Sequence, residues 1–150
     1  MVKILITIAL FLFANISFAG NGHSHKHQML EANFPYPTLD VELIKDAKDG
    51  YNLIIYTSNF HFAPENVNLA NNGNEGHAHI YINNTKFRQY SPYFHLSTNL
   101  LKNGENEIKV TLNSNDHSHF MADGMPLTFE IKLKADGTHT MAKGHKHKNY

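Results

Sequence analysis

Between residues 38 and 134, apolar and polar side chains alternate in short runs, and turn-forming residues separate the runs. The last run is the clearest, because Leu, Phe, Ile and Leu alternate with Thr, Glu and Lys from Leu127 to Leu133. Alternation with a period of two predicts strands that each bury one face. The strands that we expect lie at residues 39–44, 51–60, 77–82, 85–90, 93–96, 107–113 and 127–133.

The residues between these runs are typical of tight turns. Asp49-Gly50, Asn83-Asn84 and Asn103-Gly104 each favour a reversal between antiparallel strands. The run 51–60 is apolar on both faces at its centre, as for a central strand, and no segment keeps the 3.6-residue period of an ordinary helix. About seven short strands with regular turns predict an all-β fold, an antiparallel β-sandwich of immunoglobulin-like or cupredoxin-like type.

The start of the chain has the pattern of a signal peptide. Lys3 is followed by an apolar run from Ile4 to Phe13, and Ser17-Phe18-Ala19 has the small residues of a cleavage site. We therefore expect residues 1–19 to be removed and the mature protein to be periplasmic or secreted. No further apolar stretch predicts membrane insertion after cleavage.

Two polar segments flank the alternating region. Residues 20–37 and 135–150 are rich in histidine and lack apolar periodicity, which predicts flexible arms that cannot bury a core of their own. The alternating region, residues 38–134, is then a single β-sandwich domain. The arms are interpreted either as metal-gathering segments or as polar, solubilising tails.

The composition limits the chemistry that the chain can offer. It has no cysteine, which excludes disulfide bonds, thiolate zinc sites and blue-copper sites with a cysteine ligand. Lys and Arg together number 13 and balance 13 Asp and Glu, so no basic excess predicts nucleic-acid binding. All 12 histidines follow the predicted signal peptide. A metal would therefore be held by imidazole, carboxylate or thioether groups.

The segment Gly76 to Ile82 carries two histidines on one predicted strand. In an extended chain, His77 and His79 point to one side, whereas Ala78, Ile80 and Ile82 point to the other side and are expected to face the core. Two imidazoles at this spacing can reach a common ion. The alternative is a pair of solvated histidines on the wet face of an antiparallel strand.

Other histidines are expected to meet this pair at one end of the sandwich. If consecutive strands alternate in direction, histidines that follow upward strands share a rim with histidines that begin downward strands. His61 and the run Asp116-His117-Ser118-His119 each follow a predicted strand, and His95 comes a few residues after 85–90. Asp116 is expected to orient an imidazole instead of binding the metal. The predicted metal ligands are His77, His79, His117 and His119, followed by His95 and His61.

Several segments resemble a family of small exported bacterial proteins that are rich in histidine. The most specific are Gly76-His77-Ala78-His79 and Asn115-Asp116-His117, and the others are Asp49 to Leu53, Asn59 to Glu65 and Tyr93 to Leu96. The resemblance covers residues 38–134 and implies a single sandwich domain with a histidine site for copper or another transition metal. The chain is more distantly similar to periplasmic copper carriers with β-sandwich domains.

Three functions are consistent with these patterns. The first is an exported protein that binds a transition metal, copper before zinc or nickel, and buffers it, carries it or delivers it to a partner protein. The second is a metal-dependent enzyme with an open histidine-ligated site. The third is a structural or partner-binding sandwich whose histidines are incidental. The sequence favours the first.

Overall fold

The computed structural model describes residues 28–134 and 137–142, and within them the chain is nearly all β. The predicted signal peptide and the outer parts of both predicted arms lie outside the described residues. Two single-turn 3-10 helices, η1 (Pro64–Asn66) and η2 (Thr98–Leu100), interrupt the strands. The strands are β1 (Met29–Glu31), β2 (Thr38–Lys45), β3 (Tyr51–Ser58), β4 (His61–Phe62), β5 (Glu75–Ile82), β6 (Thr85–Gln89), β7 (Tyr93–Leu96), β8 (Glu105–Ser114), β9 (His119–Ala122), β10 (Met125–Pro126), β11 (Thr128–Lys134) and β12 (His139–Ala142).

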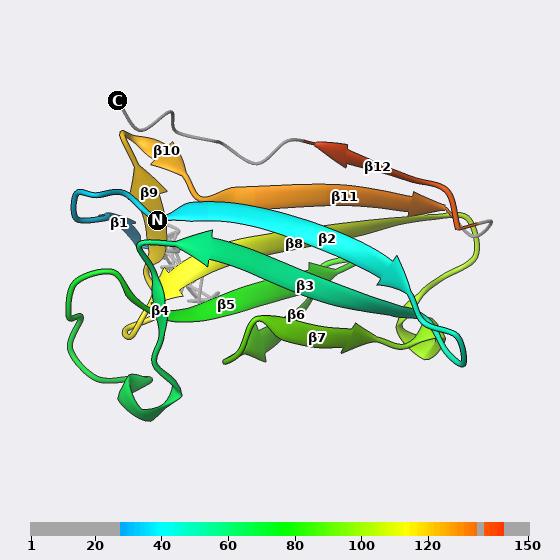
Figure 1. Ribbon diagram of the computed structural model, residues 1–150, viewed down its shortest axis with the longest axis horizontal. Coiled ribbons are helices and arrows are strands. Elements are labelled where there is room, and N and C mark those ends of the chain that lie inside the picture. Colours follow the sequence, from blue (N-terminus) through cyan, green and yellow to red (C-terminus); the bar gives the residue numbers. More distant parts are fainter. Residues whose placement is uncertain (1–27, 135–136, 143–150) are drawn as a thin grey trace, which may run out of the picture.

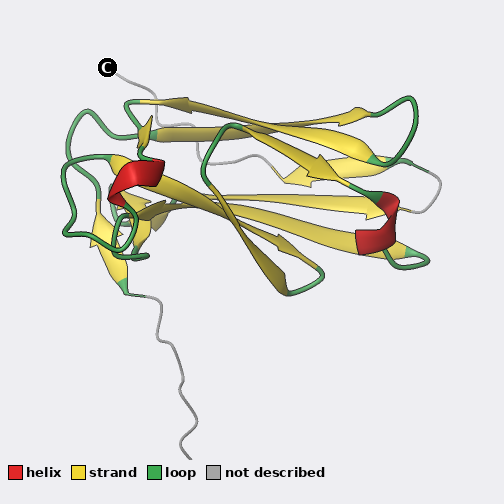
Figure 2. Ribbon diagram, turned by 90° about the horizontal axis from the view of Figure 1, so that it is seen from below, coloured by secondary structure: helices red, strands yellow, loops and turns green. Residues whose placement is uncertain are grey.

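The strands form two facing sheets, which confirms the predicted all-β sandwich (Figure 1). The larger sheet is built on the antiparallel pair β5 and β8, with β6 beside β5, and with β11 and then β12 beside β8. Strand β9 pairs with the end of β8 at Asn113. The smaller sheet has the order β2-β3-β7, so β3 is the predicted central strand. The two layers are seen from below in Figure 2.

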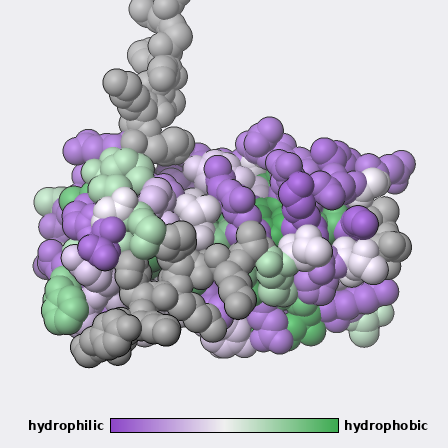
Figure 3. Space-filling view, turned by 90° about the horizontal axis from the view of Figure 1, so that it is seen from above, coloured by the Kyte–Doolittle hydropathy of each residue, from purple (hydrophilic) through white to green (hydrophobic). Residues whose placement is uncertain are grey.

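The core lies between the sheets and is filled by the inward faces of the alternating strands. Ala78, Ile80 and Ile82 of β5 are at most 1% exposed, and Ile108 and Val110 of β8 are buried beside them. Burial of an apolar side chain of this size stabilises a fold by roughly 1.5–3 kcal/mol. The outer surface seen from above is mainly hydrophilic, with apolar side chains scattered among polar ones (Figure 3).

The predicted turns fix the strand pairing. Asn83 and Asn84 adopt positive φ angles of 48° and 72° between β5 and β6, as a two-residue hairpin turn requires. Gly50 has a φ of 68°, and a Cβ atom there would lie 2.0 Å from the carbonyl oxygen of Leu96. Glycine is therefore needed where the β2–β3 turn meets the end of β7.

Two strands extend the larger sheet beyond the range 38–134 that the sequence predicts for the folded domain, and the strand count exceeds the predicted seven. Strand β1 pairs in parallel with β9, and β12 pairs antiparallel with β11. Main-chain hydrogen bonds to an existing sheet edge need no apolar periodicity. The alternation therefore could not reveal these two strands.

Candidate metal centre

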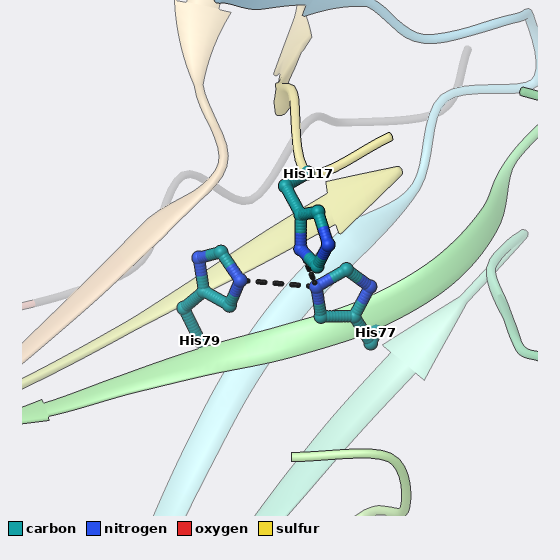
Figure 4. Close-up of side chains that lie close together, drawn as sticks. All are labelled: His77, His79 and His117. Atoms are coloured by element: carbon teal, nitrogen blue, oxygen red, sulfur yellow. Dashed lines mark hydrogen bonds between the residues drawn. The ribbon is translucent and has the colours of Figure 1, made fainter. Parts of the chain in front are cut away.

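Three imidazole nitrogens, from His77, His79 and His117, converge on the outer face of β5 and β8 (Figure 4). Nε2 of His77 lies 3.0 Å from Nε2 of His79 and 2.9 Å from Nδ1 of His117. All three nitrogens lie within 4.8 Å of one another. Nitrogens bound to one zinc or copper ion at about 2.0–2.1 Å lie at most about 4.2 Å apart. Small side-chain rotations would therefore place these residues, the histidine triad, on one ion.

His77 and His79 point away from the apolar core, as the alternation in β5 predicts, yet both side chains are buried. Their exposed fractions are 0% and 1%. The rings of Tyr90 and His117 lie 5.8 Å and 4.6 Å from the ring of His77 and help to cover it. The pair therefore lies neither in the apolar core nor on a solvent-exposed face. The alternation of residues along a strand cannot predict such a position.

The glycine before this pair sets the spacing of the two strands. A Cβ atom on Gly76 would lie 2.0 Å from the carbonyl oxygen of Asn113 in β8. No larger residue fits without moving one of the strands. The close approach places His77 directly opposite Asn113 in the antiparallel pair.

His117 is held by a tight loop between β8 and β9. Its φ angle of 70° is unusual for a residue with a side chain. Nδ2 of Asn113 donates to the carbonyl oxygen of His117 over 3.1 Å, and Oδ1 of Asp116 accepts from the amide of Ser118 and the hydroxyl of Ser114. These bonds hold the left-handed conformation that turns the ring of His117 toward β5.

Asn68 determines which nitrogen of His117 faces the triad. Oδ1 of Asn68 lies 2.7 Å from Nε2 of His117, and an amide oxygen accepts hydrogen bonds, so Nε2 of His117 carries the proton. Nδ1 of His117 then presents its lone pair to His77. The main chain of Asn68 is itself fixed, because its backbone N–H donates to the carbonyl oxygen of Asn115 over 2.8 Å. The arrangement resembles the hydrogen bonds that orient metal-binding histidines.

The protons around Nε2 of His77 are poorly balanced if all three rings are neutral. Each neutral imidazole carries one N–H group. If Nδ1 of His117 carries a lone pair, the single N–H group of His77 would have to donate to two ring nitrogens at once. These are Nδ1 of His117 at 2.9 Å and Nε2 of His79 at 3.0 Å. A bound cation removes this conflict, because all three lone pairs then point at positive charge.

Burial and neighbouring cations lower the pKa values of two histidines of the triad. The pKa of His77 falls from 6.5 to about 4, first because burial disfavours the charged ring and then because His117, Arg88 and Lys86 repel it. The pKa of His117 is lowered for the same reasons, burial first, and Asp116 partly offsets the shift. Both rings are therefore unprotonated at neutral pH, as metal binding requires.

His119 lies on the same rim but outside the triad. It is opposite Asn113 on β9, as His77 is on β5. Its Nε2 lies 3.1 Å from the carbonyl oxygen of Leu127 and 3.2 Å from Oγ1 of Thr128. The intervening β8 and these bonds direct the ring of His119 toward β11 and away from the triad.

The remaining two predicted ligands are not in the cluster either. His61 is an exposed residue of β4, paired with Glu75 at the start of β5. His95 pairs with Asn52 at the start of β3, near Asp49, and therefore lies at the opposite end of the sandwich. The prediction that His95 shares the rim is wrong. The physical reason is that β7 crosses to the smaller sheet and runs back away from the triad.

The sequence pattern does not reveal two polar residues of the site, and a third residue has a role other than the predicted one. Asn68 and Asn113 support the triad, but asparagines are so frequent in the 66–74 loop that no pattern singled out Asn68. The sequence predicts that Asp116 orients an imidazole. Its carboxylate instead holds the loop, and its pKa is lowered to about 2, because hydrogen bonds from Ser114 and Ser118 outweigh the opposing effect of burial.

No family model matches this chain, and no curated protein or solved structure matches it significantly. Within the described residues, no helix has the length and apolar character needed to cross a membrane. The function is therefore inferred from the geometry of the histidine triad.

Proposed function

We propose that this chain is an exported protein that binds a transition metal, with copper as the first choice, and that it buffers, carries or delivers this metal. The observation that supports this proposal is the convergence of Nε2 of His77, Nε2 of His79 and Nδ1 of His117 within 4.8 Å. The lone pair on Nδ1 of His117 is directed at the other two rings by Asn68. The predicted signal peptide is the basis for export.

The donor set favours copper, with zinc or nickel as the second choice. Imidazole suits Cu(II), Zn(II) and Ni(II), whereas Mg(II) and Ca(II) prefer oxygen ligands. Among divalent metals of the first row, Cu(II) binds nitrogen sites most tightly. The lowered pKa values of His77 and His117 help further, because protons do not compete with the metal at neutral pH.

A metal-dependent enzyme is the second candidate, and the number of ligands favours it. Three imidazoles with an open fourth position are also the arrangement of catalytic zinc sites. Such chemistry usually needs a nearby acid or base. The described cluster contains no carboxylate, and Asp116 is committed to the loop that holds His117. Carriage is therefore preferred to catalysis.

Competition titration with a chromophoric chelator would test the proposal on the mature chain from Gly20. We expect one tight site for Cu(II) that survives replacement of the arm histidines by alanine, because the triad is complete without them. The arm variant carries changes at His23, His25, His27, His139, His145 and His147.

Two glutamine variants provide the matched comparison. His117→Gln removes a triad nitrogen and should weaken binding by at least about tenfold, or ~1.4 kcal/mol. His119→Gln changes a histidine of the same rim outside the triad and should leave the affinity unchanged. Loss of all tight binding in the arm variant, or equal effects of the two glutamine variants, would contradict the proposal.

A further inference from the structure

The edge strand beside the triad carries a row of residues on the same face. In the β5–β6 pair, Arg88 lies opposite His79 and Lys86 lies opposite Tyr81. Directly opposed residues of antiparallel strands point to the same face, with Cβ atoms about 5 Å apart. The ring of Tyr90, which follows β6, lies 5.8 Å from the ring of His77. The triad therefore has two cationic side chains along its open edge.

Arg88 is the single arginine of the chain, and the other 12 of its 13 Lys and Arg residues are lysines. Both Arg88 and Lys86 are exposed, and neither forms an ion pair within the part of the chain that the structure describes. Both lie on the face of the sheet that carries the triad, and Arg88 is directly opposite His79. A site built for a cation alone would be weakened by such neighbours.

An anion that binds together with the metal would explain why two cationic side chains lie beside a metal site. A metal held by three imidazoles retains an open coordination position. Arginine differs from lysine because its planar guanidinium donates two parallel hydrogen bonds to a carboxylate or phosphate. An oxygen anion at the open position would be attracted both by the metal and by Arg88.

We propose that the metal held by the histidine triad binds an oxyanion of the carboxylate or phosphate class, with one oxygen on the metal and another paired with Arg88. This inference rests on the proposed metal-binding function. It makes the anion a co-ligand, so that metal and anion each strengthen the binding of the other by the same factor. Loading and release of the metal would then depend on the anion present.

Titration of the Cu(II)-loaded mature chain with acetate and with inorganic phosphate, at pH 7 and constant ionic strength, tests the inference. Sodium chloride replaces the anion in the reference samples. We expect at least one oxyanion to change the visible ligand-field band and the electron paramagnetic resonance spectrum of the copper in a saturable way. The separate titrations with acetate and with phosphate distinguish a carboxylate ligand from a phosphate ligand.

Arg88→Gln is the decisive variant, and Lys45→Gln is the control. Arg88→Gln should raise the half-saturating anion concentration at least about tenfold, as expected for the loss of a charge-assisted hydrogen-bonded pair. It should also bind Cu(II) more tightly than the wild type when no oxyanion is present, because one repulsive charge is gone. Lys45→Gln removes an exposed cation on β2, in the other sheet, and should change neither quantity.

The outcomes separate this inference from the proposed function. Failure of the wild type to bind Cu(II) overturns both. Tight Cu(II) binding without any spectral response to either anion overturns the inference alone, and so does an equal response in wild type and Arg88→Gln. Circular dichroism and thermal unfolding of both variants establish that they are folded, which is expected because Arg88 and Lys45 are exposed.

Discussion

Acidification should destabilise the metal-free protein between pH 6.5 and pH 4, and the buried residue His77 should make the largest contribution. Its pKa is about 4 in the folded protein and 6.5 as an ordinary histidine. Between these two values the unfolded chain binds a proton that the folded chain does not, so stability falls as the pH falls. At about 1.4 kcal/mol per pH unit, the interval corresponds to a loss of about 3 kcal/mol.

The two carboxylates whose pKa values are lowered most affect the stability in a lower pH range. The pKa values of Asp49 and Asp116 are lowered from 3.8 to about 2, so the stability that they contribute is lost below pH 4. The pKa of His117 is also lowered, and this residue therefore adds to the loss in the same direction as His77. The pKa of Glu75 is lowered from 4.5, mainly by a hydrogen bond from Asn115, so its contribution is lost below about that pH. The region above pH 4.5 thus reports mainly on the histidines.

Urea denaturation of the metal-free protein, at several pH values between 4 and 7 and with a chelator present, measures the effect. In His77→Gln the side chain stays polar but no longer titrates, so the dependence on pH should become clearly shallower. His61→Gln removes an exposed histidine of the same rim and should keep the slope of the wild type. If His77→Gln and the wild type have the same slope, His77 is not a buried neutral ring and the reasoning is refuted.

Two further substitutions distinguish a residue that stabilises the fold from a residue that supports metal binding. Ile80→Ala should lower the free energy of unfolding by about 2–5 kcal/mol, because Ile80 is 0% exposed in the core. Its Cu(II) affinity should stay within about twofold of the wild type. A loss of affinity as large as that of His117→Gln in a chelator titration would contradict the assignment of the two faces of β5. Asn68→Gly keeps a backbone suited to φ 67° but removes the acceptor for Nε2 of His117, and we expect Cu(II) affinity to fall about 10–100-fold. Asn99→Ala, at an exposed position in η2, is the control and should leave affinity unchanged; a similar loss in both asparagine variants would remove the orienting role of Asn68.

The strands and the first two ligands could be predicted because they depend on short-range rules. The pleat alone places His77 and His79 on one face and Ile80 on the other. The turn residues place β5 and β6 next to each other. Burial of the two histidines could not be predicted, since it arises where Tyr90 and His117 pack over them.

His95 shows why the shared rim was only partly predictable. Counting alternating strands requires knowing where each strand starts along its neighbour. Strand β7 begins opposite Ile54 in the middle of β3, so His95 pairs with Asn52, six residues before Ser58. Six residues of extended chain correspond to about 20 Å. The error therefore comes from the register of β7 along β3 within the smaller sheet, which no local pattern contains.

Strand β6 has a second property besides its position next to the triad. Among the described strands it pairs with β5 alone, so its outer edge carries main-chain groups that could join the edge of another molecule. Charged side chains on such an edge discourage aggregation between copies. Lys86 and Arg88 are both on this strand and exposed. Arg88, the proposed partner of the anion, thus also protects this edge together with Lys86. Neutralising both cations would be expected to promote self-association of an otherwise folded protein.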